Sequence, residues 1–260
     1  MRRAATTPSI RSRNSRGIDH KSRSVAFRVD TEDRRLDDSA MHERRFPGET
    51  ERYRTARDEL LRAEIELRRR TEQVAALRRA LPTGGEVPLD YVFLVDGDGE
   101  VRLSELFGEH DTLVLYNFMF GPNMAEPCPM CSSFLDGLEG NAEQIQQRTA
   151  LAVVARTAMG RIRAFVDKRG WKRLRVVSSA GNDFNRNYFG EDENGEQNPM
   201  LHVFTRIGGP IRHYWSSELF FVPAEQGQNQ RHLDTMWPLW NVLDTTPGGR
   251  GENFYPQLWY

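Results

Sequence analysis

The chain has only two cysteines among its 260 residues, Cys128 and Cys131, which excludes a disulfide-rich secreted scaffold. No run approaches the roughly 20 uninterrupted apolar residues of a membrane span. The basic N-terminus lacks the apolar core of a secretory signal. There is no glycine-rich phosphate loop and no His-Glu metal pair. We therefore expect a cytoplasmic protein that acts without a membrane, a cofactor or a metal.

Charge is distributed unevenly along the chain. Residues 1–28 hold eight Lys or Arg and one acid, Asp19, which gives this segment +7 and leaves −8 for the rest of a chain whose total is −1. A mildly acidic body excludes a nucleic-acid surface. The composition of residues 1–46 predicts a disordered basic extension rather than a transit peptide, because large apolar residues are scarce. Met41 is an alternative start of the chain.

A long helix is predicted from Thr50 to about Leu81, where good helix formers occur without internal glycine or proline. Pro47-Gly48 precedes it and Pro82 follows it. Its apolar residues recur at alternating spacings of four and three, except where Arg70 interrupts them. They are Ala56, Leu60, Ala63, Leu67, Val74, Leu77 and Leu81. We expect this segment, 47–84, to pack along its own domain, with the seam of a homodimer as the alternative.

The segment 85–247 shows the apolar pattern of an α/β fold. Nearly continuous apolar runs predict strands that are buried on both faces, and a turn-rich segment predicts an antiparallel hairpin. The predicted strands are Tyr91–Val95, Val101–Leu103, Thr112–Phe120, Ala150–Ala155, Leu174–Ser178, Met200–Arg206 and Ile211–Trp215, and the predicted helices are 129–147 and 159–171. This order predicts a mixed central sheet flanked by helices. We expect the tail, 248–260, to pack on this domain.

Both cysteines lie in one motif, Cys128-Pro129-Met130-Cys131, between a predicted buried strand and a predicted helix. A thiol is nucleophilic as thiolate, and a free cysteine with a pKa near ~8.5 is mostly protonated at neutral pH. The N–H groups and dipole of a helix N-terminus favour the anion, and Pro129 suits the first turn. Cys131 lies one turn further, within reach of a disulfide. We predict that Cys128 attacks and Cys131 resolves.

Three other uses of the two cysteines are weaker. Structural zinc needs four ligands, and the nearest histidines, His110, His202 and His213, are not at zinc-knuckle spacing. An iron–sulfur cluster shared across a dimer has no further cysteine to support it. Two inert core thiols are the remaining alternative. Redox chemistry is favoured because the motif follows a buried strand and opens a helix.

The order strand, loop, C-P-x-C and helix resembles the thioredoxin superfamily. VRLSELFGEHDTLVLYNF resembles the entry hairpin of its peroxiredoxin and thiol-reductase branch. The resemblance implies a thioredoxin-like fold with a proline, usually preceded by a cis peptide bond, before the strand that faces the active site. Pro199 occupies this place, before Met200. It implies a substrate groove formed by Pro129, Pro199 and Met200.

A closer resemblance covers most of the chain from Arg45 onward. Six segments carry it: RFPGETERYRTARDELLRAEIELRRR, LPTGGEVPLDYVF, FMFGP, CPMC, SSAGNDFN and LDTTPGGR. Together they resemble a bacterial family classed as a domain of unknown function (number 899) and described as predicted dithiol–disulfide oxidoreductases. This resemblance implies the activity but no particular substrate.

The chain departs from its better-known relatives at several positions. Compact thioredoxins have Trp before the first cysteine, where this chain has Pro127. Their buried carboxylate has no counterpart in 113–120, where Asn117 is the most polar residue. The Pro-x-x-x-Thr-x-x-Cys motif of peroxiredoxins would need Pro and Thr where Gly121 and Ala125 stand. These departures weaken a peroxidase function.

The segment SSAGNDFN follows the third buried strand of the predicted α/β unit and is rich in side chains that hydrogen-bond turns. One interpretation is a turn that closes the loop. The other places Asp183 near the thiols as a proton acceptor, because sites form at the carboxyl ends of strands in open α/β sheets.

The sequence thus predicts a dithiol–disulfide oxidoreductase that acts on a protein or small-molecule thiol or disulfide. The first alternative is a non-catalytic thioredoxin-fold scaffold that assembles through the helix at 50–81. The second is a thiol-dependent peroxide reductase.

Overall fold

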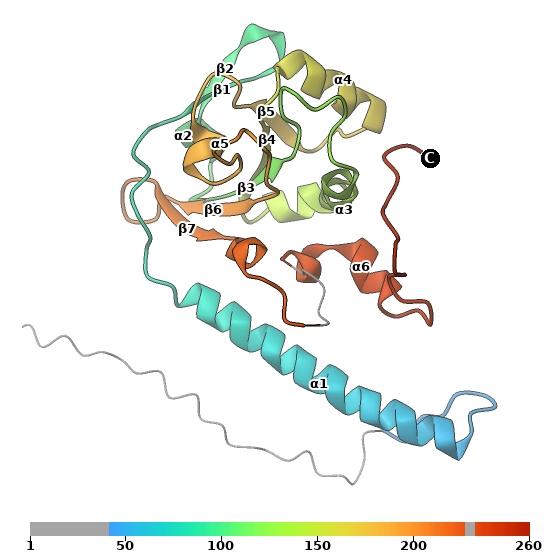
Figure 1. Cartoon of the computed structure of the whole chain (residues 1–260). Helices are drawn as coiled ribbons and strands as arrows, with labels where there is room; N and C mark the ends of the chain where they lie inside the picture. The colour runs from blue at the N-terminus through green and yellow to red at the C-terminus, as the bar shows by residue number, and fades with distance from the viewer. Residues whose placement is uncertain (1–41, 227–231) are drawn as a thin grey trace, which may run out of the picture. The chain divides into compact units, whose positions relative to one another are not determined.

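The computed structural model describes residues 42–226 and 232–260 (Figure 1). The basic extension predicted for residues 1–46 lies outside this range up to residue 41. The described chain forms two units, one ending at Leu67 and one spanning Arg68–Tyr260. None of the described helices combines the length and the apolar character that crossing a membrane requires.

The first unit consists of a short loop and most of α1 (Glu51–Arg79), the helix predicted at 50–81. Thr50 caps this helix, because its Oγ1 accepts the backbone N–H of Tyr53 at 3.2 Å. Arg54 is buried and pairs with Asp58 at 2.9 Å and with Glu49 at 3.6 Å. The start of the helix is therefore stabilised by the Thr50 cap and by the ion pairs of Arg54.

The rest of α1 belongs to the second unit. Here Val74, Leu77 and Leu81 are 43%, 59% and 41% exposed. The part of the predicted apolar stripe that lies in this unit is thus partly exposed.

A seven-stranded sheet forms the centre of the second unit, in the order β2-β1-β5-β4-β3-β6-β7. The three central strands β3, β4 and β5 run parallel, and every other pairing is antiparallel. The strands are β1 (Val92–Leu94), β2 (Glu100–Arg102), β3 (Thr112–Phe118), β4 (Ala150–Ala155), β5 (Arg175–Ser178), β6 (Leu201–Thr205) and β7 (Arg212–Ser216). The predicted mixed sheet of a thioredoxin-like fold is confirmed.

The helices flank this sheet. They are α2 (Leu103–Leu106), α3 (Pro129–Gln146), α4 (Met159–Arg169), α5 (Phe184–Asn187) and α6 (Pro238–Leu243), with the 3-10 turns η1 (Asp96–Asp98), η2 (Glu218–Phe221) and η3 (Asp234–Met236). The helices predicted at 129–147 and 159–171 are present. The second ends early because Gly170, at φ +80°, donates its N–H to the Val166 and Asp167 carbonyls. Sequence patterns missed α2, α5, α6, η2 and η3.

The sheet separates two hydrophobic cores. Along β3, Tyr116 and Phe118 point to one side and Leu113 and Leu115 to the other, as the period of two requires. We call the side that packs against α3 and α4 the α3 face, and the side that packs against α2 and α5 the α5 face. Cys131 belongs to the core of the α3 face.

The C-terminal tail contacts the second unit along the α3 face. The ring of Trp259 lies 5.5 Å from that of Phe165, and Lys168 Nζ lies 3.5 Å above the Trp259 ring. Nearer to α6, Phe254 packs edge-on against Trp240 with ring centroids 6.0 Å apart. These contacts fix the course of the tail on both sides of Tyr255.

Candidate active site

The two cysteines lie where β3 gives way to α3. Cys128 is the N-cap of α3 and Pro129 is its first residue. The backbone N–H of Cys128 donates to the Met119 carbonyl at 3.0 Å, and the Cys128 carbonyl accepts both the N–H and the hydroxyl of Ser132 at 3.0 and 2.9 Å. The sulfur of Cys128 therefore projects from a fixed helix N-terminus.

The environment of Cys128 favours its thiolate. A hydrogen bond from the Cys131 side chain is the main cause that lowers the pKa of Cys128 to about 6. Partial burial opposes this shift, whereas the backbone N–H groups of Cys131 and Met130 and the hydroxyl of Tyr255 add to it. At neutral pH the half-buried Cys128 is therefore mainly charged.

Cys131 is the opposite case. It is buried, and burial raises its pKa well above the ordinary thiol value, with a further contribution from neighbouring Cys128. The buried hydroxyl of Tyr116 lies beside it without a hydrogen bond of ordinary geometry, and burial followed by the charge of Cys131 raises the pKa of Tyr116. Both cysteines are free thiols in this structure. Cys131 is thus kept protonated beside a charged Cys128.

Tyr255 is the residue of this site that the sequence analysis missed. Its hydroxyl lies 3.7 Å from Cys128 Sγ, across a separation of 127 residues. Burial raises the pKa of Tyr255, and so does its hydrogen bond to Cys128, so the phenol remains a hydrogen-bond donor. The aromatic composition of the tail was the only available signal, and it indicated docking rather than a position.

Arg161 of α4 holds the loop that leads to Cys128. Its guanidinium donates to the carbonyls of Pro122 and Ala125, each at 3.1 Å, and also to that of Met124. It also lies 4.7 Å from the centre of the Phe120 ring. One planar, permanently charged group therefore fixes several carbonyls of an irregular loop.

Pro199 precedes β6 as expected, but the cis peptide bond implied by the resemblance is wrong. No peptide bond within 42–226 or 232–260 is cis. Asn117 of β3 fixes this segment instead: its backbone N–H donates to the Met200 carbonyl at 2.7 Å and its side chain donates to the Asn198 carbonyl at 2.6 Å. The backbone of Pro199 also hydrogen-bonds His232.

Met200 and Asp183 are not brought into contact with the thiols by any described interaction. The Met200 side chain is fully buried and lines a cavity on the α5 face, so the structure does not support a role in the groove. Asp183 is exposed and precedes α5, where its carbonyl accepts the N–H of Asn187. The alternative interpretation of SSAGNDFN, a turn that closes a loop, agrees better with these positions.

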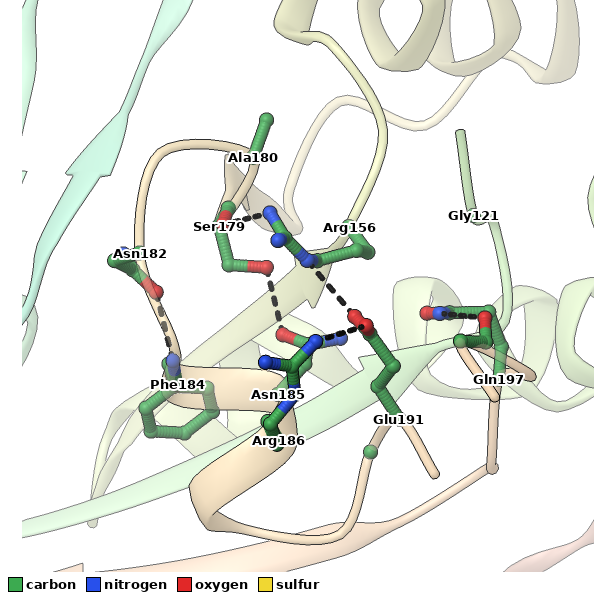
Figure 2. A network of polar contacts seen from close by, with 12 residues as sticks. Gly121, Arg156, Ser179, Ala180, Asn182, Phe184, Asn185, Arg186, Glu191 and Gln197 are labelled. Atoms are coloured by element: carbon green, nitrogen blue, oxygen red, sulfur yellow. Dashed lines mark hydrogen bonds and ion pairs between the residues drawn. The ribbon is translucent and has the colours of Figure 1, made fainter. Parts of the chain in front are cut away.

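The SSAGNDFN segment takes part in a buried polar network, most of which Figure 2 shows. Asn185 Nδ2 donates to Asn117 Oδ1 and Ser179 Oγ donates to Asn185 Oδ1, each at 2.6 Å. Arg156 donates to the Ser179 carbonyl and to Glu191, each at 2.8 Å. The network thereby links the ends of β3, β4 and β5 to the loop that carries Pro199.

Gln197 of that loop lies against Gly121, at the start of the loop that leads to Cys128 (Figure 2). A Cβ at Gly121 would come within 2.9 Å of Gln197 Cγ, so a larger residue there would have to displace the Gln197 side chain. The loop that leads to Cys128 and the loop that carries Pro199 are thus packed against each other. No group of three or more His, Cys, Asp or Glu side chains arranged to hold a metal occurs in the part of the chain that the structure describes.

Comparison with known proteins adds the following. Residues 43–260 match a family described as "Bacterial protein of unknown function (DUF899)". Among solved structures, the chain is similar to peroxidoxin BcpB from Mycobacterium tuberculosis, with 15% identity, 63% of this chain and 98% of that chain covered, and a TM-score of 0.41. It is also similar to a mutant of PrxQ from Xylella fastidiosa, with 16% identity, 64% and 96% coverage, and a TM-score of 0.40. No curated protein matches the chain.

Proposed function

The chain belongs to this bacterial family, DUF899, and we propose that it is a dithiol–disulfide oxidoreductase that uses Cys128 and Cys131. The observation that carries the proposal is the opposite shift of the two thiols: the pKa of Cys128 is lowered to about 6, whereas that of buried Cys131 is raised. Exchange requires this division between an accessible thiolate and a protected second thiol.

The reaction proceeds in two exchanges. The Cys128 thiolate attacks one sulfur of a substrate disulfide, which forms a mixed disulfide and releases the other substrate sulfur as a thiolate that takes up a proton. Cys131 then loses its proton and attacks Cys128 Sγ. This step forms the Cys128–Cys131 disulfide and releases the second substrate thiol. Two electrons pass from the protein to the substrate, and the reverse sequence oxidises a dithiol.

Tyr255 acts on Cys128 in the first exchange and in the reversal of that exchange. Its hydroxyl donates to the thiolate when Cys128 attacks the substrate disulfide and, in the reverse sequence, when Cys128 leaves the mixed disulfide. Pro129 and Pro199 line the groove that receives the substrate beside the thiols. A protein or small-molecule thiol or disulfide is the substrate, and a reducing cytoplasm is the compartment in which the two free thiols are maintained.

A redox titration tests the proposal. The protein is equilibrated in a series of thiol redox buffers, and free thiols are trapped with a mass-tagging maleimide, with Cys128→Ser and Cys131→Ser as controls. We expect a reversible two-electron step between roughly −270 and −120 mV, the range of thioredoxin-like catalysts, and no such step in either variant. Thiols that never pair, or pair irreversibly, would exclude dithiol exchange.

The same variants separate the two alternatives. A scaffold would keep its partners after both cysteines are changed to serine. A peroxide reductase would consume peroxide and form a sulfenic acid at Cys128. We expect neither result, because the lowered pKa of Cys128 serves no purpose in a scaffold and the peroxide-activating threonine is replaced by Ala125.

We also propose that two copies associate through the stripe on α1. Leu60, Leu67 and Leu77 are 52%, 66% and 59% exposed at seam spacing. Sedimentation equilibrium should give a dimer for the parent protein and a monomer for Leu60→Glu/Leu67→Glu. A parent protein that sediments as a monomer would contradict this proposal without affecting the thiol chemistry.

A further inference from the structure

A second site with no part in thiol exchange lies on the α5 face. A cavity of about 740 Å³ opens between β7 and the segment that follows α5, lined in part by Tyr188, Phe189, His213 and Phe221. The rings of Tyr188 and His213 pack on Phe204, at 5.1 and 5.7 Å, and Phe204 belongs to the core of the α5 face. The sheet therefore lies between this cavity and Cys131. Its volume is in the range of about 300–1,000 Å³ that holds small organic molecules.

Aromatic rings form much of the lining. The rings of Tyr188 and His213 are 5.9 Å apart, and those of Phe189 and Phe221 are also 5.9 Å apart in an edge-on arrangement. The last two are 63% and 49% exposed. Large aromatic side chains are thus presented to solvent at the rim of a cavity, an arrangement that indicates binding rather than core packing.

Phe189 has an unusual backbone conformation, with φ at +56°. It follows α5, at a position where glycine or asparagine is the usual left-handed residue. A bulky residue in this region is strained, and strain of this kind gathers at ligand sites. Because the ring is mostly exposed, burial does not compensate for the strain. The conformation does, however, place an aromatic face at the rim.

The full charges that line the cavity are negative. Glu86 and Glu218 are its charged side chains, and no Lys or Arg occurs among the described residues of the lining. Glu86 is paired with Arg212 at 3.5 Å, so Glu218 carries the main uncompensated charge. Burial lowers the pKa of His213, which keeps its ring neutral at physiological pH.

A buried polar group borders the same space. Ser216 Oγ lies 2.7 Å from His202 Nδ1 and 2.7 Å from His213 Nε2. The hydroxyl can donate to one ring and accept from the other. Burial lowers the pKa of both imidazoles, so neither offers a positive charge to an anion in the cavity at neutral pH.

We propose that this cavity binds an organic cation with an apolar body. The ammonium group lies near the Glu218 carboxylate and against the rings of Phe189 and Phe221, whose electron-rich faces attract cations. The apolar body fills the interior beside Tyr188 and His213. An anion would face Glu218 without a cationic partner, and a neutral ligand would leave that carboxylate unused.

Calorimetric titration of the full chain tests the proposal with three probes that share one apolar body. Phenylbutyl-trimethylammonium should bind at least about tenfold more tightly than phenylbutanol, and phenylbutanesulfonate should not bind. Equal or tighter binding of the alcohol or the sulfonate would overturn the proposal, and so would no binding of the cation.

Two variants connect the binding to this cavity. Glu218→Gln should weaken cation binding about five- to tenfold, whereas Glu100→Gln, the same change at an exposed residue on edge strand β2, should not. Phe189→Gly should weaken binding while the stability is kept or raised, because glycine adopts positive φ readily. Equal effects of the two Gln variants, or full binding by Phe189→Gly, would contradict the assignment.

The thiol chemistry is independent of this result. The Cys128→Ser protein should bind the cation as tightly as the parent does. A loss of cation binding in that variant would show that the two sites are coupled, contrary to the separation argued above.

Discussion

Two groups of buried polar side chains, on opposite faces of the sheet, differ in their hydrogen bonding. On the α5 face, Asn117 and Asn185 are fully buried, and their amides are hydrogen-bonded. On the α3 face, the Tyr116 hydroxyl is buried without a hydrogen-bond partner, and Cys128 is mainly charged at neutral pH because its pKa is lowered to about 6. The hydrogen-bonded amides hold the backbone in place, whereas the reactive thiol lies where a hydroxyl has no partner and the pKa values of ionisable groups are shifted.

The largest expected effect concerns the buried hydrogen-bond network of Asn117. Asn117→Leu keeps the branched shape of the side chain but leaves the Asn198 carbonyl and Asn185 Nδ2 without a partner, and it removes one of the two hydrogen bonds to the Gly190 carbonyl. Each unsatisfied buried group costs about 1–3 kcal/mol, so we expect the free energy of unfolding in urea to fall by about 3–4 kcal/mol. Asn141→Leu on the exposed side of α3 is the matched control. A loss below about 1 kcal/mol would mean that the network is not structural.

The sequence predicted the parts of this contrast that depend on local pattern. The nearly continuous apolar run of β3 predicted a strand that is buried on both faces, and the Pro129 that follows Cys128 predicted the helix N-terminus. Contacts between distant segments left no such pattern. Asn117 was noted only as the most polar residue of its strand, because its partners lie 68 to 81 residues away. The short helices α5 and α6 have too few residues to show a period.

The second prediction concerns acid stability on the α5 face. Burial, followed by the charge of His213, lowers the pKa of His202 from 6.5 to about 3. Between these two values the unfolded chain binds a proton that the folded chain does not. The free energy of unfolding therefore falls as the pH falls, by about 1.4 kcal/mol per pH unit.

Urea unfolding at about pH 6 and about pH 4 measures this slope. His202→Leu should make the slope shallower by about 2–3 kcal/mol over the interval. Ser216→Ala should keep the slope, because it removes the partner of His202 but not the titrating ring. If His202→Leu leaves the slope unchanged, then His202 becomes protonated without unfolding, and the α5 face is less rigid than its contacts indicate.

The third prediction concerns the loop before Cys128, whose carbonyls Arg161 holds. Arg161→Met removes the donors that hold the carbonyls of Pro122, Met124 and Ala125. Because the loop is partly exposed and water can replace some of these bonds, we expect a loss of only about 1–2 kcal/mol in unfolding free energy. Arg161→Lys should recover little of it, since one ammonium cannot reach so many carbonyls. Full recovery by lysine would show that charge, and not the planar fork, holds the loop.

The smallest expected effect concerns the hydrogen bond from Tyr255 to Cys128. Tyr255→Phe keeps the ring and removes the hydroxyl that donates to Cys128 Sγ at 3.7 Å. Tyr255 contributes less to the lowered pKa of Cys128 than Cys131 does, so we expect this pKa to rise by only about 0.5–1 unit. Thiolate absorbance against pH measures the change, and the alkylation rate near pH 6 should fall about two- to fivefold.

Tyr260→Phe is the control for the Tyr255 variant, because it changes the same tail at a side chain that is 99% exposed. If both variants shift the pKa of Cys128 equally, the tail acts by covering the thiol and the hydrogen bond is incidental. If only Tyr255→Phe shifts it, a residue 127 positions away along the chain tunes the nucleophile. In that case the reduced, charged form loses stabilisation, so the redox potential of the cysteine pair should also become more negative.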